Sequence, residues 1–237
     1  RGGRNAKGRP IVNLLPLEKD ERIQAVLPVK EFNDDQFIFM ATETGSVKKT
    51  KLSAYSRPMK SGIKAIKLRD GDRVVNAEIT DGTKEIMLFS NSGKSIRFKE
   101  SDARPMGRVS QGVRGMRIDK NQKIISLVVL EEGNILVATE NGYGKQTLTD
   151  EFSIQKRGGK GVIAIQTSDR NGNLIGTKQV STGDEVMFIS TSGNLIRTRT
   201  DDISIIGRNT QGVRLIRLSE DDKLLGMEKV ISEDDEE

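Results

Sequence analysis

The sequence has no cysteine, no histidine and no tryptophan, and aromatic residues make up only 4% of it. Without cysteine there is no disulfide and no thiolate chemistry, and without histidine the commonest general base and metal ligand is missing. No apolar run approaches the roughly 18 residues of a membrane-spanning helix, and the N-terminal residues show no hydrophobic segment of signal type. We therefore expect a soluble, cytoplasmic protein without metal, cofactor or membrane contact.

Charged residues are abundant, but the two signs are unevenly distributed. The chain has 39 Lys and Arg against 34 Asp and Glu, and five of those acids fall in residues 232–237, SEDDEE. Removing these five from the 34 leaves 29 acids against 39 bases over residues 1–231. We expect a basic domain followed by a disordered acidic tail, which either only solubilises the protein or competes with a polyanion for the basic surface.

Two short patterns repeat along the chain, with 48 to 54 residues between successive copies. The first is an apolar segment, a glycine turn and a returning segment, and its turn glycines are Gly45, Gly93, Gly142 and Gly193. The second is a glycine followed by alternating apolar and polar residues, and it begins at Gly8, Gly62, Gly112, Gly161 and Gly212. Two independent markers with one period indicate a modular architecture.

Each repeat has the pattern of β structure. The first element, for example LFSNSG at 88–93, is typical of a hairpin. The second also alternates, and after an acidic turn it is followed by a third apolar run such as VVNAEIT at 74–80. Four strands in about 50 residues predict an all-β ring or shallow spiral of about five four-stranded, propeller-like blades.

We expect a single domain over residues 1–231. Its predicted repeats are 8–58, 59–107, 108–156, 157–207 and a partial one at 208–231. Because the chain ends on half a repeat and no hairpin precedes Gly8, we expect the parent protein to supply a leading half-repeat that covers the open sheet edges.

Basic side chains recur on the returning strand of each hairpin and in the connections around the second pattern. Those that we expect to bind DNA are Lys48, Lys49, Lys51, Lys64, Arg97, Lys99, Arg104, Arg108, Arg114, Lys145, Lys156, Arg157, Lys160, Arg197, Arg199, Arg208 and Arg214. Equivalent positions of a ring of repeats fall on equivalent edges, so these cations should form one continuous basic rim.

A basic rim suits duplex DNA, whose backbone presents one negative charge per about 1.7 Å of helix axis. The scarcity of aromatic residues argues against stacking of single-stranded bases. We therefore expect binding that depends on shape and backbone rather than on base identity.

Residues 155–161, QKRGGKG, combine three cations with three glycines. Such a composition is typical of a loop that grips phosphate, because glycine lets backbone N–H groups approach an anion closely. The alternative is a mobile basic linker. The residues concerned are Gln155, Lys156, Arg157, Gly158, Gly159, Lys160 and Gly161.

Other motifs give no catalytic, cofactor or metal site. GRVSQGVR at 107–114 has glycines at phosphate-loop spacing but lacks the following Lys and Ser or Thr. DRNGNL at 169–174 begins like a calcium loop, yet Leu174 stands where that loop needs glycine. Carboxylate pairs such as Asp70 and Asp72 fall in repeated turns, where Asp satisfies backbone N–H groups.

Four stretches resemble the C-terminal DNA-wrapping domain of the DNA gyrase A subunit family. They are GRPIVNLLPLEKDERI (8–23), NGYGKQT (141–147), VMFISTSGNLIRTRTDDISIIGRNTQGVRLIR (186–217) and QKRGGKG (155–161). The last is similar to that family's gyrase box, Gln-Arg-Arg-Gly-Gly-Lys-Gly, with Lys156 in place of the first arginine. The family's box belongs to the first blade, whereas the copy here lies in a later one.

The resemblance implies a β-pinwheel that wraps double-stranded DNA around its outer rim. In that family the domain works in a heterotetramer with the N-terminal part of the gyrase A subunit, and with the gyrase B subunit, to supercoil DNA negatively at the expense of ATP. The cleaving tyrosine and the ATP site belong to other parts of that bacterial, nucleoid-associated topoisomerase. This chain should then bind and bend DNA without catalysis of its own, and Tyr55 and Tyr143 should be structural.

Two alternatives remain open at this stage. The first is the corresponding domain of the topoisomerase IV homologue. The second is a propeller used as a protein-interaction platform, which the lack of WD or kelch signatures disfavours.

Overall fold

The computed structural model describes residues 15, 17 and 21–230. Within these ranges the regular secondary structure is almost wholly β strand, and the helices there are 3₁₀ turns of three or four residues. The acidic tail and the copy of the second pattern at Gly8 lie outside the described residues. No helix in the described ranges is long and apolar enough to cross a bilayer.

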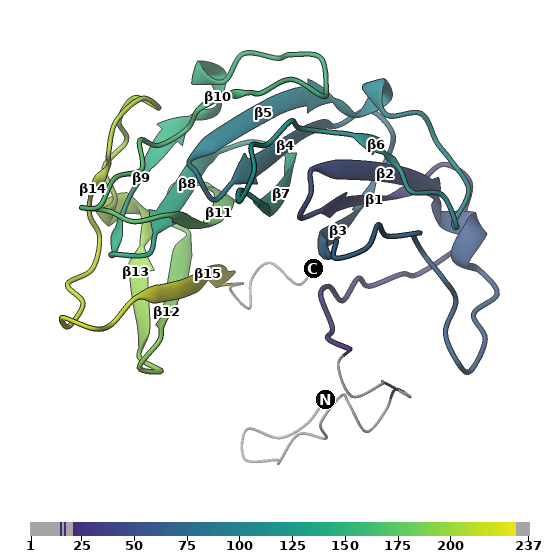
Figure 1. The fold of residues 1–237 in the computed structure, drawn as a ribbon, viewed down its shortest axis with the longest axis horizontal. Helices are drawn as coiled ribbons and strands as arrows, with labels where there is room; N and C mark the ends of the chain where they lie inside the picture. The colour runs from purple at the N-terminus through teal and green to yellow at the C-terminus, as the bar shows by residue number, and fades with distance from the viewer. Residues whose placement is uncertain (1–14, 16, 18–20, 231–237) are drawn as a thin grey trace.

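The described residues form four antiparallel sheets that follow one another along an arc (Figure 1). Sheet A has the strand order β3 (Val74–Thr80), β1 (Phe37–Thr42), β2 (Ser46–Lys51), β6 (Val113–Arg114). Sheet B has the order β7 (Ile124–Leu130), β4 (Glu85–Ser90), β5 (Lys94–Lys99), β10 (Val162–Ile163). The predicted all-β, propeller-like class is confirmed.

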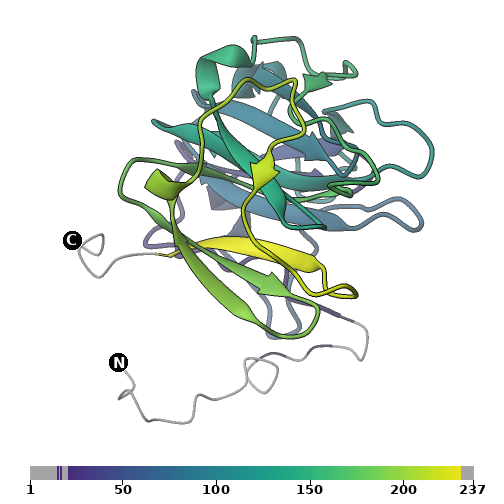
Figure 2. The same ribbon diagram turned by 90° about the vertical axis from the view of Figure 1, so that its left-hand side faces the viewer.

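Sheets C and D continue the arc. Sheet C has the order β11 (Leu174–Val180), β8 (Asn134–Thr139), β9 (Tyr143–Leu148), β14 (Val213–Arg214). Sheet D has three strands, in the order β15 (Leu224–Val230), β12 (Glu185–Ser190), β13 (Leu195–Arg199). Figure 2 views the arc from this end, with sheet D in front.

The sheets interlock along the chain. Sheet A takes its hairpin from residues 37–51, its inner strand from 74–80 and its outer strand from 113–114. Each four-stranded sheet thus draws on three consecutive predicted repeats. The predicted repeat boundaries divide the sequence, but they cut across the sheets, because each four-stranded sheet takes its outer strand from the connection between two strands of the next sheet.

The interlocking gives the arc an inner and an outer side. The inner strands β3, β7, β11 and β15 lie next to one another around the concave middle, and the short strands β6, β10 and β14 lie at the convex edge (Figure 1). The connections that carry these short strands therefore form the convex rim.

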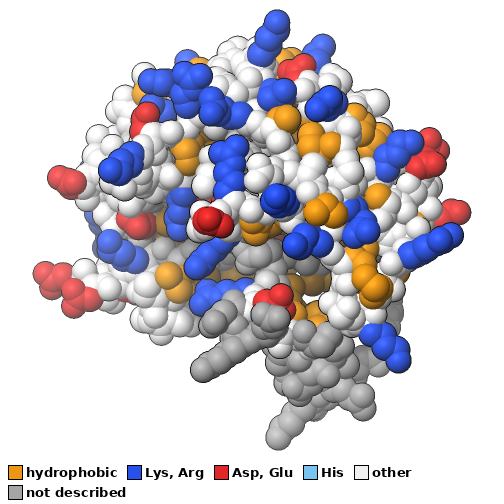
Figure 3. Space-filling view, turned by 45° about the vertical axis from the view of Figure 1, so that its right-hand side comes forward, with side chains coloured by type: hydrophobic (Ala, Val, Ile, Leu, Met, Phe, Trp, Pro, Cys, Tyr) orange, Lys and Arg blue, Asp and Glu red, His pale blue; other side chains and the backbone are white. Residues whose placement is uncertain are grey.

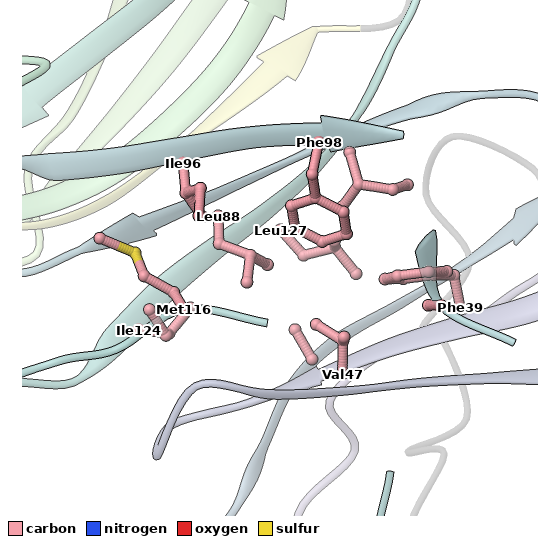
Figure 4. Packing of buried hydrophobic residues seen from close by; sticks show 11 residues of the cluster. Phe39, Val47, Leu88, Ile96, Phe98, Met116, Ile124 and Leu127 are labelled. Atoms are coloured by element: carbon pink, nitrogen blue, oxygen red, sulfur yellow. The ribbon is translucent and has the colours of Figure 1, made fainter. Parts of the chain in front are cut away.

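Neighbouring sheets pack face to face through apolar side chains. Between sheets A and B, Phe39 and Val47 of one sheet pack against Leu88, Ile96 and Phe98 of the next (Figure 4). Successive residues of a strand point to opposite faces, and in β1, β4 and β8 both faces meet another sheet or a covering segment. These strands are consequently apolar at consecutive positions and almost entirely buried.

Sheet D differs, because no further sheet covers its second face within the described residues. Ile189 is 41% exposed, while its counterparts Phe89 and Ala138 are fully buried. Leu195, which starts β13, is 64% exposed. The far face of sheet D thus has the apolar surface of an inter-sheet contact without a partner in the described part of the chain.

Glycine is required where each outer strand begins. Gly161 has φ of +72°, a conformation that residues with a Cβ rarely adopt, and a Cβ added there would lie 2.1 Å from the carbonyl oxygen of Ser95. Gly62 holds the same place in the pattern with φ of +78°, but nothing lies within 4 Å of an added Cβ.

Replacing Gly161 by alanine should therefore destabilise the fold by about 2 kcal/mol or more, because strain and a backbone clash add. Gly62→Ala should cost only the strain, on the order of 1 kcal/mol. Urea denaturation of both variants measures the difference. Equal losses would show that close packing of the outer strand on β5 does not matter.

Candidate nucleic-acid interface

The 17 cations predicted to bind DNA fall into three groups by exposure. Ten are exposed: Lys51, Lys64, Lys99, Arg104, Arg114, Lys156, Lys160, Arg197, Arg199 and Arg214. Four are partly buried: Arg97, Arg108, Arg157 and Arg208. Three are buried: Lys48, Lys49 and Lys145.

The three buried lysines cannot reach DNA in this fold, so their prediction as contacts was wrong. Lys48 Nζ donates hydrogen bonds to the Ala65 carbonyl at 2.7 Å and to Thr50 Oγ1 at 2.7 Å. Lys145 Nζ donates to the Gly207 carbonyl. Lys49 Nζ donates to the Glu100 carbonyl at 3.3 Å and pairs with that residue's carboxylate at 3.7 Å. All three tie a strand to a neighbouring connection.

Burial also lowers the pKa of two of these lysines. Removal from water lowers the pKa of Lys48 to about 8, with a smaller contribution from the positive charge of Arg108. It lowers the pKa of Lys145 to about 8 as well, with Glu151 acting in the opposite direction. Hydrogen bonds to carbonyl oxygens keep both groups in place.

Partly buried Arg97 also belongs to an inter-sheet contact. Its Nη1 donates to the carbonyls of Thr149, at 2.9 Å, and Phe152, at 3.0 Å, and its Nη2 pairs with Glu85 at 2.6 Å. The two carbonyls belong to the 3₁₀ turn η4 (Thr149–Glu151) and its cap in the next sheet. Lys49 in sheet A and Gln146 in sheet C hold the same register position and contact the corresponding turn of their next sheet.

In sheet D this register position is Arg197, which is exposed and pairs with Glu185 of its own sheet. No turn of a following sheet accepts its hydrogen bonds within the described residues. Arg197 therefore remains on the surface, whereas its counterpart Arg97 does not.

The other three partly buried arginines connect successive segments of the rim by hydrogen bonds. Arg108, Arg157 and Arg208 each stand four residues before the glycine of the second pattern. Each donates from Nη1 to a carbonyl of the preceding connection: Arg108 to Lys64 at 3.0 Å, Arg157 to Arg114 at 2.9 Å and Arg208 to Ile163 at 3.0 Å. These bonds are equivalent in all three copies, so the arginines form a repeating clamp.

Backbone hydrogen bonds accompany this clamp. The amides of Lys67, Arg117 and Gln166 donate to the carbonyls of Ser110 at 3.1 Å, Gly159 at 2.8 Å and Thr210 at 2.8 Å. We call the connections joined in this way, residues 62–72, 105–118, 154–167 and 205–218, the outer belt. It runs along the convex edge and fixes the positions of the cations that it carries (Figure 1).

The heptad 155–161 is part of the outer belt and is tightly bonded to its neighbours. The Gln155 amide donates to the Arg97 carbonyl at 2.7 Å, and the Gly158 amide donates to the Gly115 carbonyl at 2.6 Å. Arg157 Nε adds a bond to the Asp102 carbonyl at 2.8 Å. The heptad is therefore not a mobile linker, and only its Lys156 and Lys160 side chains face solvent without a bonded partner in the described structure.

The ten exposed cations differ in whether an acidic side chain forms an ion pair with them. Lys51 pairs with Asp34 at 3.5 Å, Arg197 with Glu185, and Arg199 with Asp201 at 3.7 Å. Seven have no acidic partner within 4.0 Å in the described part of the chain: Lys64, Lys99, Arg104, Arg114, Lys156, Lys160 and Arg214. Figure 3 shows many Lys and Arg side chains across one face, with acidic side chains fewer and mostly toward its edges.

Two features of the rim were not predicted. Arg170 and Arg214 lie over the ring of Tyr143, with guanidinium carbons 4.8 Å and 5.3 Å from its centroid. Arg214 Nη2 also donates to the Tyr143 hydroxyl at 2.8 Å, and this bond lowers the pKa of Tyr143. Arg69 is the second feature, and it lines a hollow on the rim together with Arg114 and Arg117. The signal that was overlooked is that Arg69 and Arg170 flank the turns after the second pattern.

Known proteins share this arrangement of sheets. The family model described as DNA gyrase C-terminal domain, beta-propeller, matches residues 1–30, 36–81, 84–131, 133–181 and 184–231. The last four segments each cover one hairpin and the inner strand of the same sheet. The chain belongs to the DNA gyrase C-terminal domain family. The predicted resemblance is thereby confirmed, and the five matched segments agree with about five blades.

Curated relatives are considerably longer than this chain. The DNA gyrase A subunit of Escherichia coli is 51% identical over 235 residues, which cover 99% of this chain and 27% of the relative. The DNA gyrase A subunit of Pseudomonas aeruginosa is 46% identical over 96% of this chain and 29% of the relative. The chain thus spans a little over a quarter of these gyrase A subunits.

A solved structure of a DNA gyrase A C-terminal domain matches 95% of this chain and 76% of the solved chain, with a TM-score of 0.84 and 27% identity. The C-terminal domain of DNA topoisomerase IV matches 96% of this chain and 72% of the solved chain, with a TM-score of 0.90, also at 27% identity. The two solved domains share the fold of this chain to a similar degree.

The lowered pKa of Lys48 predicts a pH-dependent stability. Between pH 8 and about 10.5, the ordinary pKa, the unfolded chain holds a proton that the folded chain has lost. The contribution of Lys48 to the free energy of unfolding should therefore rise with pH over this window. Urea denaturation should show the stability of the wild type increasing relative to Lys48→Met from about pH 8 to about pH 10. The exposed Lys51→Met serves as control and should show no such trend.

The arginine clamp predicts different roles for two residues of the heptad. Arg157→Ala removes bonds from a charged donor to two carbonyls and should destabilise the fold by about 1–2 kcal/mol. Lys160→Ala removes an exposed side chain and should change stability by less than about 0.5 kcal/mol. Thermal denaturation distinguishes them, and an equally small effect of both substitutions would rule out the clamp.

Proposed function

We propose that the chain binds double-stranded DNA along the convex edge of the arc and bends it there. The observation that carries the proposal is that seven of the predicted cations are exposed and have no acidic partner among the described residues, most of them in or next to the outer belt. A duplex supplies the missing negative charge, and its phosphates release counterions when Lys and Arg neutralise them. Binding then depends on backbone contacts and tolerates different sequences.

A rigid convex edge also supports bending. Bending a site of 20 to 30 base pairs costs on the order of 1–6 kcal/mol, which several phosphate contacts can offset. Because clamps and backbone hydrogen bonds fix the outer belt, its cations need little reordering when DNA binds. A flexible basic segment would lose more conformational entropy for the same contacts.

Family membership gives this DNA binding a biological setting. We infer that the domain wraps DNA for a bacterial gyrase and so supports ATP-dependent negative supercoiling in the cytoplasm. It acts there with the rest of the gyrase A subunit, and also with the gyrase B subunit. The domain itself is non-catalytic in this proposal. Its Tyr55 lies in the 3₁₀ turn η2 (Leu52–Tyr55), and Tyr143 is held by two arginines on the rim.

A role in a topoisomerase IV-type enzyme is the second candidate, favoured by the TM-score of 0.90 to that domain. Gyrase remains the first choice because identities to gyrase A subunits reach 51%. A plasmid topology assay tests the difference, since the gyrase role requires a wrap of defined hand. The chain is bound to relaxed plasmid, a relaxing topoisomerase is added, and the sign of the trapped linking change is measured.

DNA binding itself predicts a steep salt dependence. If all seven cations contact phosphate, the log-log slope of affinity against salt should approach about 6, at about 0.9 per contact. Lys156→Ala with Lys160→Ala should lower the slope by about 2 without changing the melting temperature. Fluorescence anisotropy with a labelled duplex measures both slopes. A slope near zero for the wild type would reject the proposal.

In the plasmid topology assay described above, a positive linking change is expected if the domain also wraps DNA.

A further inference from the structure

One hollow on the convex edge collects positive charge without acid. Its volume is about 240 Å³, and it is lined by Thr44, Ser46, Arg69, Arg114, Met116, Arg117 and Ile118. The three arginines come from the ends of two successive belt connections, and none of them has an acidic partner within 4.0 Å in the described ranges. Three unpaired guanidinium groups around one hollow give a strongly positive potential there.

Asp72 places a carboxylate against the lining residue Thr44, and both of its oxygens are already hydrogen-bonded. Asp72 Oδ1 accepts from the Thr44 amide at 3.0 Å and from the Arg73 amide at 2.9 Å, and Oδ2 accepts from Thr44 Oγ1 at 2.6 Å. Asp72 thus fixes the turn between β1 and β2 that forms one wall. Its charge does not neutralise the arginines by direct pairing.

At the equivalent position of sheet C, a tyrosine side chain occupies the space that is open in sheet A. Ser46 pairs with Arg114 across β2 and β6, and Tyr143 pairs with Arg214 in the same way across β9 and β14. In sheet C the tyrosine ring lies beneath two arginines, and its hydroxyl accepts a bond from Arg214. In sheet A the small Ser46 leaves that volume open, and Arg114 has no such acceptor among the described residues.

The heptad 155–161 holds the arginine-bearing backbone in position. Arg157 Nη1 donates to the carbonyl of Arg114, the Gly158 amide donates to the carbonyl of Gly115, and the Arg117 amide donates to the carbonyl of Gly159. The bond from Gly158 has no equivalent in the other belt connections described. Both Arg114 and Arg117 are therefore braced by the heptad from the neighbouring connection.

We propose that this hollow, the arginine seat, binds one phosphate group, and that the heptad positions it. Guanidinium groups match phosphate oxygens bidentately. The volume is smaller than the roughly 300 Å³ or more of sites for drug-sized ligands, which favours a single phosphate over a whole nucleotide. This inference rests on the proposed function, because the phosphate that we assign to the seat belongs to the bound duplex.

Three variants of the chain test the seat. Arg69→Ala removes one guanidinium. Ser46→Tyr fills the hollow as Tyr143 does in sheet C and leaves the charge unchanged. Arg73→Ala is the matched control, because it removes the same charge from the same turn but does not line the hollow. Melting temperatures establish that each variant is folded.

Duplex binding is measured by fluorescence anisotropy over a range of salt concentrations. Arg69→Ala and Ser46→Tyr should each lower the log-log salt slope by about 0.9, the value of one phosphate contact. Arg73→Ala should leave the slope unchanged. Since Ser46→Tyr alters no charge, its effect would separate occupancy of the seat from general electrostatic attraction.

Inorganic phosphate is the second probe, followed through the amide resonances of residues 44–47 by NMR. Phosphate should shift them in the wild type and in Arg73→Ala, but not in Arg69→Ala or Ser46→Tyr. Phosphate shifts with unaltered salt slopes would overturn the assignment to DNA and indicate a site for free phosphate. If neither probe responds to Arg69→Ala and Ser46→Tyr, the seat does not exist. Failure of the wild type to bind duplex while phosphate still shifts these amides would reject the proposed function and retain the anion site.

Discussion

The fold depends on hydrogen bonds from side chains of one sheet to backbone carbonyls of the next. Sheets packed face to face bury the ends of their connections, and buried carbonyls need donors. Lys49, Arg97 and Gln146 supply them to the 3₁₀ turns, and three arginines supply them along the rim. The arc keeps its shape because the same contact recurs between successive sheets, and the cations that remain exposed are fixed relative to that frame.

The period, the hairpins and the glycine positions could be predicted from the sequence, since each has a local signal. The interlocking of sheets could not, because the repeating pattern that contains Val113–Arg114 does not show that this two-residue strand pairs with β2, 66 to 68 residues upstream. The buried lysines were missed for a related reason. The alternation of apolar and polar residues distinguishes the two faces of a strand, but it does not show whether the polar face is covered in the fold. On β2 and β9 that face is covered, so Lys48 and Lys145 are buried although their positions in the sequence are typical of solvent-facing residues.

The composition of the heptad QKRGGKG is explained by a division of roles among its residues. Gly161 permits close packing on the Ser95 carbonyl, and Gly158 takes a left-handed conformation that directs its amide to Gly115. Arg157 is a structural donor, while Lys156 and Lys160 face solvent. A loop that looks like a phosphate grip in sequence therefore acts first as a brace for the neighbouring connection. In the proposed function, phosphate contacts the residues that the heptad leaves free or holds in place.

Divergence between repeats decides which cations are available to a ligand. The backbone places an arginine at the same point of sheets A and C, but the residue opposite differs. Tyr143 binds Arg214 within the protein, whereas Ser46 leaves Arg114 without an acceptor in the described structure. In sheet B the corresponding pair is Lys94 and Ile163, and Lys94 lies 4.0 Å from Asp119. A single side chain per repeat thus sets whether a rim position is neutralised, occupied internally or open, so a periodic frame produces a rim whose available positive charge varies from blade to blade.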